Sequence, residues 1–150
     1  MRAVIQRVSS ASVESDGIVT GRIGRGLLIL LGIALEDEKD DAKWLVDKIW
    51  QMRLFPDQEQ KMNLALKDID GEFLLISQFT LHASTKKGNR PSFLGSARQE
   101  QAIPLYEYFK DYLEKISSKE VKTVIFGADM KVSLLNDGPV TILLDSKNKE

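Results

Sequence analysis

The sequence contains few of the side chains on which hydrolytic enzymes ordinarily rely. It has a single histidine, His82, and no cysteine. We therefore expect no metal site built on histidine and thiolate ligands and no disulfide framework. A serine–histidine–aspartate triad would need His82 as its base. His82 lies close to Ser77 and Thr80 in the chain, so a triad is one hypothesis, but a loop or strand-end residue without a chemical role is the favoured interpretation.

Acidic residues gather between Glu36 and Asp41. Paired carboxylates can perform acid–base catalysis. This run stands at the start of a predicted helix, however, where negative charge interacts favourably with the helix dipole. A structural role is the better interpretation. The glycines form neither a phosphate-binding loop nor a G-x-S-x-G nucleophile motif, so the sequence predicts no cofactor.

Two polar segments are unusual. Ser77–Leu81 closes an otherwise apolar strand, and serine, glutamine and threonine gain nothing in a core strand unless they turn outward or line a pocket. The second segment, Asn136–Thr141, is by itself typical of a tight turn between two strands, in which Asn and Gly supply special backbone angles and Pro139 begins the next strand. Each segment alone favours an ordinary structural role.

The surrounding pattern predicts strands and two helices. Short runs rich in apolar and β-branched residues, separated by Asp-Gly and Gly-rich turns, predict strands over 2–14, 18–23, 27–34, 73–81, 121–126, 131–135 and 140–144. The first helix carries Ala42, Leu45, Val46, Ile49 and Met52 on one face, with Asp37 or Asp40 as N-cap, and ends near Phe55-Pro56. The second carries Ala102, Leu105, Tyr106, Phe109, Leu113 and Ile116, with Pro104 in its first turn.

The length of 150 residues fits one domain covering positions 1–150. Strands joined by short turns are mostly antiparallel neighbours. The expected fold class is therefore α+β, with a curved, barrel-like, mostly antiparallel sheet and two helices packed on one side.

Composition limits the partners. The net charge is −1 and the pI is about 5.9, whereas proteins that bind a nucleic-acid duplex mainly through its phosphates are usually basic. No DNA partner is expected, and any RNA contact should be local. The longest apolar stretch, Leu27–Leu31, is far shorter than the roughly 20 residues of a membrane helix, and no signal peptide is evident. These features predict a cytoplasmic protein without a membrane partner.

The two polar segments together resemble the signature motifs of D-aminoacyl-tRNA deacylases of the bacterial and eukaryotic type. The stretches 1–8, 87–93 and 126–130 match that family in order and spacing, so the resemblance covers nearly the whole chain. It implies an editing hydrolase that cleaves D-aminoacyl-tRNA, and glycyl-tRNA, to the free amino acid and tRNA. It also implies a homodimer with active sites at the subunit interface.

The resemblance further implies a role for each motif. A cis Gly138-Pro139 bond of one subunit faces the α-carbon of the amino acid bound by the other, and it blocks L-amino acids. Arg7 holds that dipeptide, and Met130 belongs to the same substrate-binding, chirality-selecting set. The segment Ser77, Gln78, Phe79 and Thr80 supplies catalysis, through backbone N–H groups that stabilise the oxyanion while the 2′-hydroxyl of the tRNA assists the attacking water.

Two alternatives stay open. Thr80 carries the hydroxyl best placed to be a nucleophile, although a pocket-lining role is favoured. A non-catalytic module that binds an RNA end or a small ligand is the second function hypothesis, because no conventional acid–base residue is present. Contacts with the aminoacylated 3′ end of tRNA are expected from Lys86, Lys87 and Arg90, on a loop between His82 and Ser96.

Overall fold

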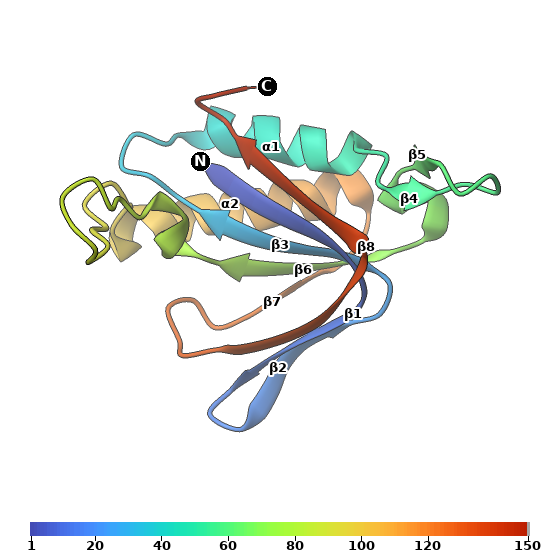
Figure 1. The fold of residues 1–150 in the computed structure, drawn as a ribbon, viewed down its shortest axis with the longest axis horizontal. Helices are drawn as coiled ribbons and strands as arrows, with labels where there is room; N and C mark the ends of the chain where they lie inside the picture. The colour runs from blue at the N-terminus through green and yellow to red at the C-terminus, as the bar shows by residue number, and fades with distance from the viewer. Residues whose placement is uncertain (150) are drawn as a thin grey trace.

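The computed structural model describes residues 1–149 and consists of a strongly curved sheet with two helices on one side (Figure 1). Within these residues, no helix is both long and apolar enough to cross a membrane. The elements, in chain order, are β1 (Arg2–Ser15), β2 (Ile18–Ile23), β3 (Gly26–Gly32), α1 (Lys39–Gln51), β4 (Phe55–Pro56), β5 (Met62–Leu64), the 3₁₀ turn η1 (Leu66–Ile69), β6 (Glu72–Ser77), the 3₁₀ turn η2 (Phe79–His82), α2 (Gln99–Ser117), β7 (Val121–Thr123) and β8 (Lys131–Asp145).

Strand β1 organises the sheet. It pairs antiparallel with β2, β3 and β8, whereas β3 pairs parallel with β6 and β6 parallel with β7. The parallel pairs follow from the chain path, because the connections from β3 to β6 and from β6 to β7 each run through a helix. The predicted α+β class, with a barrel-like sheet and two helices on one side, is confirmed, with these two parallel pairings added.

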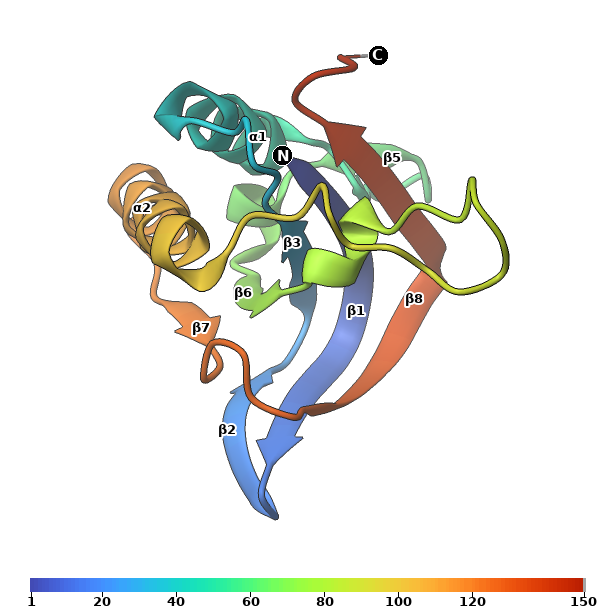
Figure 2. The same cartoon turned by 90° about the vertical axis from the view of Figure 1, so that its left-hand side faces the viewer.

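The curvature brings the two ends of the sheet together at a glycine. A Cβ atom on Gly21 of β2 would lie 3.2 Å from the carbonyl oxygen of Thr123 in β7 and 3.1 Å from the Leu74 side chain. A Cβ here would force these neighbours to shift by a few tenths of an ångström, whereas glycine allows the approach without adjustment. Figure 2, turned by 90°, shows the strands wrapping around a common interior.

Two apolar clusters fill the molecule. The larger lies between the sheet and the helices and includes Leu45, Phe73 and Phe109, none of which is exposed. The smaller lies inside the curve of the sheet and includes Val13 and Leu74. The sheet is thus buried on both faces at β3, which explains the uninterrupted apolar run in that strand.

The helix starts differ in detail from the prediction. Glu38, and neither Asp37 nor Asp40, is the N-cap of α1, and its backbone N–H donates to Asp41 Oδ2 at 2.8 Å. The carboxylate of Asp37 instead accepts from the Met1 amino group at 2.5 Å and from the Ala34 backbone N–H at 2.7 Å. This carboxylate therefore joins the loop before α1 to Met1, the residue that precedes β1.

Helix α2 begins at Gln99, so Pro104 lies in its second turn and not its first. Pro104 is exposed, and a carbonyl left without its amide partner on that side can bind water. The helix thus continues through a residue that was expected in its first turn.

Strand β8 is one strand where two were predicted. Gln6 pairs with Thr141 and Val8 pairs with Asn136, so four residues, 137–140, bulge out opposite the single residue Arg7. The bulge is closed locally, because Val140 N–H donates to Asn136 Oδ1 at 2.8 Å. The predicted tight turn at 136–141 is thus wrong: pairing with β1 resumes on both sides and keeps the strand continuous.

Candidate active site

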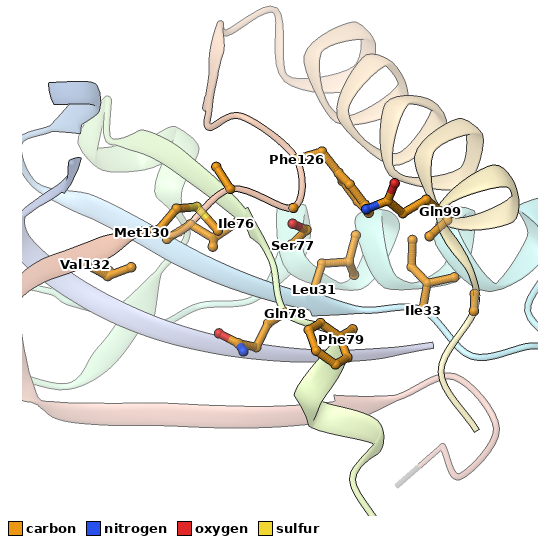
Figure 3. Close-up of a pocket in the computed structure, with 14 residues that line it drawn as sticks. Leu31, Ile33, Ile76, Ser77, Gln78, Phe79, Gln99, Phe126, Met130 and Val132 are labelled. Atoms are coloured by element: carbon orange, nitrogen blue, oxygen red, sulfur yellow. The ribbon is translucent and has the colours of Figure 1, made fainter. Parts of the chain in front are cut away.

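A cavity of about 370 Å³ lies where the C-terminal ends of β3 and β6 meet the start of α2 and the segment 126–130 (Figure 3). Its volume falls within the range of small-molecule sites. The lining is mostly apolar with a few polar groups and comprises Leu31, Ile33, Ile76, Ser77, Gln78, Phe79, Ala97, Gln99, Ala102, Phe126, Gly127, Ala128, Met130 and Val132. The aromatic wall at Phe126 rests edge-on against Tyr106. Burial raises the pKa of Tyr106, so this hydroxyl remains a donor.

The backbone turn beside the cavity carries two amide groups that are not used within the turn. The predicted strand 73–81 ends at Ser77, and the chain continues as η2. Gln78 N–H donates to the Leu31 carbonyl at 2.8 Å, and the first bond within the turn runs from Leu81 N–H to the Gln78 carbonyl at 3.2 Å. The N–H groups of Phe79 and Thr80 precede that bond and have no partner within the turn.

The side chains of this turn show no conventional nucleophile–base pair. Thr80 is exposed, and its hydroxyl accepts a hydrogen bond from the side-chain amide of Gln78, which cannot remove a proton. His82 Nε2 is buried and has no hydrogen-bond partner within residues 1–149, so it does not pair with Ser77 or Thr80. The geometry gives no support to a serine–histidine triad.

Three residues from elsewhere in the chain hold the turn. Arg2 Nη1 donates to the Leu81 carbonyl at 2.9 Å, and the Ser96 hydroxyl donates to the Phe79 carbonyl at 3.0 Å. Gly32 supplies space, since a Cβ there would lie 2.9 Å from the Cβ of Leu81. Sequence reasoning missed these residues, because each is distant from the motif in the chain and ordinary in type.

The bulge in β8 forms a second feature, held by a buried arginine. Arg7 Nε donates to the Asp137 carbonyl at 2.8 Å, and Nη1 donates to the Leu54 carbonyl at 2.5 Å. The Gly138-Pro139 peptide bond is cis, and Gly138 has a φ of 138°, a conformation that favours glycine.

The predicted residues therefore fall into separate groups. Ser77, Gln78, Phe79 and Met130 line the cavity, while Thr80 lies on the same turn outside the lining set. Arg7 lies beside Gly138 and Pro139, but that dipeptide is exposed and does not line the cavity of its own chain.

The predicted cations lie on an exposed loop. Lys86, Lys87 and Arg90 stand between Ser84 and Ser92, whose backbones exchange hydrogen bonds of 2.8 and 2.9 Å. None of these three cations forms an ion pair within residues 1–149. Across all of the described residues, 1–149, no cluster of His, Cys, Asp or Glu could hold a metal ion.

Comparison with known proteins places the chain in a family. A family model described as D-Tyr-tRNA(Tyr) deacylase matches residues 4–145. The chain belongs to this family. A D-aminoacyl-tRNA deacylase of Cytophaga hutchinsonii is 59% identical over 150 residues, covering all of both chains. The family resemblance inferred from the two motifs is thereby confirmed.

Solved structures of similar chains agree with the fold. The c-Myc DNA Unwinding Element Binding Protein is 42% identical and superposes with a TM-score of 0.90 over 97% of this chain and 98% of its own. A structure described as that of a probable eukaryotic D-amino acid tRNA deacylase is 15% identical and has a TM-score of 0.79 over 95% of this chain and 97% of its own. At that identity, the second likeness concerns the fold alone.

Proposed function

We propose that this protein is a D-aminoacyl-tRNA deacylase, a hydrolase that cleaves the ester between a D-amino acid and the 3′ end of tRNA. Membership of the deacylase family supports the reaction class. The observation that carries the proposal is the pair of backbone N–H groups of Phe79 and Thr80 at the edge of a mostly apolar cavity. Preorganised amides beside such a cavity are suited to stabilise the oxyanion of an ester under attack.

The proposed chemistry needs no nucleophilic side chain. A water molecule adds to the ester carbonyl carbon, the carbonyl oxygen becomes an oxyanion held by the two amides, and the bond to the 3′ oxygen of the terminal adenosine then breaks. The 2′-hydroxyl of that adenosine assists the water, and the departing 3′ oxygen receives a proton. The ester is already reactive, so orientation and electrostatic stabilisation suffice. Ser77 and Gln78 complete the catalytic segment around the cavity.

We further propose that selection for D-amino acids comes from a second copy of the chain. Gly138 and Pro139 are exposed and do not line their own cavity, so they are free to enter that of a partner subunit. Apolar side chains are exposed along the same strand, at Leu134, Leu135 and Leu143, and offer a dimer surface. A rigid main-chain wall beside the α-carbon rejects an L-side chain but not a D-side chain, and it does not reject glycine.

The test is hydrolysis of D-tyrosyl-tRNA compared with L-tyrosyl-tRNA by the purified protein. We expect release of D-tyrosine to be faster by at least about 100-fold, because a steric clash that removes the productive pose costs several kcal/mol in the transition state. Glycyl-tRNA should also be hydrolysed. Equal rates for the two enantiomers would overturn the proposal. A non-catalytic module that binds RNA ends, the alternative, would protect both esters or change neither.

The three loop cations give a separate prediction about substrate binding. Replacing Lys86, Lys87 and Arg90 together by alanine should lower kcat/KM for D-tyrosyl-tRNA by about 10- to 100-fold at low salt, because each lost phosphate contact removes counterion release. A plot of log kcat/KM against log salt should become shallower by about 2. A matched triple variant at the exposed residues Lys61, Lys67 and Lys115 should leave the slope unchanged. If both triple variants change it equally, the loop has no specific role.

The name of the c-Myc element binding protein refers to DNA, and we do not extend that partner to this chain. With a net charge of −1, this chain lacks the overall basic charge that duplex binding through phosphates ordinarily requires. The proposed partner is the aminoacylated 3′ end of tRNA in the cytoplasm.

A further inference from the structure

The segment that surrounds the reactive turn has an unusual charge distribution. The whole chain contains 22 acidic residues, yet none lies between residues 73 and 99, which include four lysine or arginine residues. These are Lys86, Lys87, Arg90 and Arg98, all exposed. A chain that is acidic overall therefore presents one stretch of purely positive charge, and that stretch begins at the strand leading into the cavity.

An exposed aromatic pair lies in the same segment. Phe79 lines the cavity and is 56% exposed, and Phe93 is 37% exposed. The two rings meet edge to face, with their centroids 5.1 Å apart. Phe93 is not among the cavity-lining residues, so its ring lies immediately outside the rim formed by Phe79.

The backbone that carries Phe93 is fixed on both sides. Ser92 N–H donates to the Ser84 carbonyl at 2.9 Å, and Ala97 N–H donates to the Ile33 carbonyl at 2.9 Å. Between them, the Ser96 hydroxyl donates to the Phe79 carbonyl. The Phe93 ring therefore extends from a backbone segment that hydrogen bonds fix in place. This reduces the conformational entropy that the protein loses when a ligand stacks on the ring. Figure 2 shows the loop that precedes this segment projecting beyond the sheet.

We propose that this surface is a binding site for the single-stranded end of RNA: the base of the nucleotide preceding the terminal adenosine stacks on Phe93, and the adjoining phosphates lie against Lys86, Lys87 and Arg90. The inference rests on the proposed function, which places the ester of the terminal adenosine at the edge of the cavity. It adds a base-stacking residue that is separate from the catalytic turn. Sites for single strands characteristically combine an aromatic ring with a cationic track in this way.

The features on this surface favour RNA over a protein partner. The cations are unpaired within the described residues, and no carboxylate in the segment would repel a phosphate backbone. A partly exposed aromatic ring beside the proposed position of the terminal adenosine's ester matches the next base along the strand. A second copy of this chain is the other conceivable occupant, and the experiment below separates the two.

The experiment compares two substrates with each of three variants. The substrates are D-tyrosyl-tRNA and D-tyrosyl-adenosine, which ends at the terminal nucleotide and has no base to stack on Phe93. The variants are Phe93→Leu, which keeps apolar contact with Phe79 but lacks a π face, Phe93→Trp, and the control Leu94→Ala. Leu94 is 87% exposed on the same segment and is not aromatic.

The readout is the ratio of kcat/KM for the tRNA to kcat/KM for the adenosine ester. Phe93→Leu should lower this ratio by about 5- to 100-fold, the loss expected for one base–aromatic stack. Phe93→Trp should maintain it, and so should Leu94→Ala. Removing the penultimate base from the tRNA should lower the ratio for the wild-type protein by the same factor and have no further effect on Phe93→Leu, because both changes remove one interaction.

An unchanged ratio in Phe93→Leu, with wild-type hydrolysis intact, would overturn this inference but not the proposed function. Failure of the wild-type protein to hydrolyse either substrate would overturn the proposed function itself. A shift of Phe93→Leu from dimer to monomer in sedimentation, with both substrates impaired alike, would assign the surface to a second copy of the chain and also overturn the inference.

Discussion

Gly138→Ala is expected to lower kcat/KM for D-tyrosyl-tRNA by at least about 1,000-fold, which corresponds to about 4 kcal/mol of lost transition-state stabilisation. A Cβ at this position would lie 2.7 Å from Arg7 Nη2 and 2.8 Å from Val140 Cγ2, and the φ of 138° is itself unfavourable for an L-side chain. Arg7 cannot move away readily, because the carbonyl oxygens of Asp137 and Leu54 hold its guanidinium. The bulge must therefore change shape, and with it the proposed wall.

Kinetics and thermal unfolding together test this prediction. Gly95→Ala is the matched control, since a Cβ at Gly95 meets nothing within 4 Å. The control should retain both activity and melting temperature. A Gly138→Ala protein that folds and hydrolyses the D-ester at the wild-type rate would show that the bulge takes no part in the reaction.

Gly32→Ala should displace the turn that carries the Phe79 and Thr80 amides. We expect kcat to fall by about 100-fold with little change in KM, because a displacement of about 1 Å at a reactive group has an effect of that size. The added Cβ would lie 2.9 Å from the Cβ of Leu81, 3.0 Å from the Gln78 carbonyl oxygen and 3.1 Å from the His82 ring. The nearest atoms belong largely to the body of η2, so the turn that carries the Phe79 and Thr80 amides has to move. Overpacking should also destabilise the fold by about 1–3 kcal/mol.

The split between kcat and KM is the decisive measurement for Gly32→Ala. A lower melting temperature with unchanged kcat would mean that Gly32 only packs and does not position the amides. Gly95→Ala again serves as the control for adding one methyl group.

The two glycine variants can also be combined to show in which subunit the bulge acts. If the Gly138 bulge enters the partner's cavity, a heterodimer of Gly138→Ala and Gly32→Ala chains contains one site with an intact bulge and an intact turn. Co-refolding equal amounts of the two chains should then restore about a quarter of the wild-type activity, because half the dimers are mixed and each mixed dimer has one intact site. No recovery would mean that the bulge acts within its own chain.

Much of the fold could be predicted from local sequence patterns. The apolar residues of α2 recur with the period of a helix, which indicates one buried face, and the uninterrupted apolar run of β3 indicates a strand buried on both faces. Both patterns can be recognised from the sequence alone. The parallel pairing of β3 with β6 could not be predicted in this way, because it depends on where the chain returns after α1. Nor could the continuity of β8, since Asn-Asp-Gly-Pro is an ordinary turn sequence and only its pairing with β1 makes it a bulge.

The site was predictable only in part, and for a similar reason. The polar end of the apolar strand pointed to Ser77 and Gln78 as pocket residues, because burying such groups in a core without partners is unfavourable. Arg2, Gly32 and Ser96 carry no comparable signal. Their roles depend on distances across the fold, and a glycine that merely leaves room cannot be distinguished in sequence from one that makes a turn.

The proposed oxyanion-binding role of the Phe79 and Thr80 amides also bears on how this protein could be inhibited. Every amino acid except proline carries the same backbone amide, so a ligand anchored on these two groups recognises no particular side chain. Point substitutions at 79 or 80 would leave its main attachment in place. An anionic mimic of the reaction's tetrahedral intermediate, designed around this turn, would therefore leave few routes to resistance by single amino-acid changes.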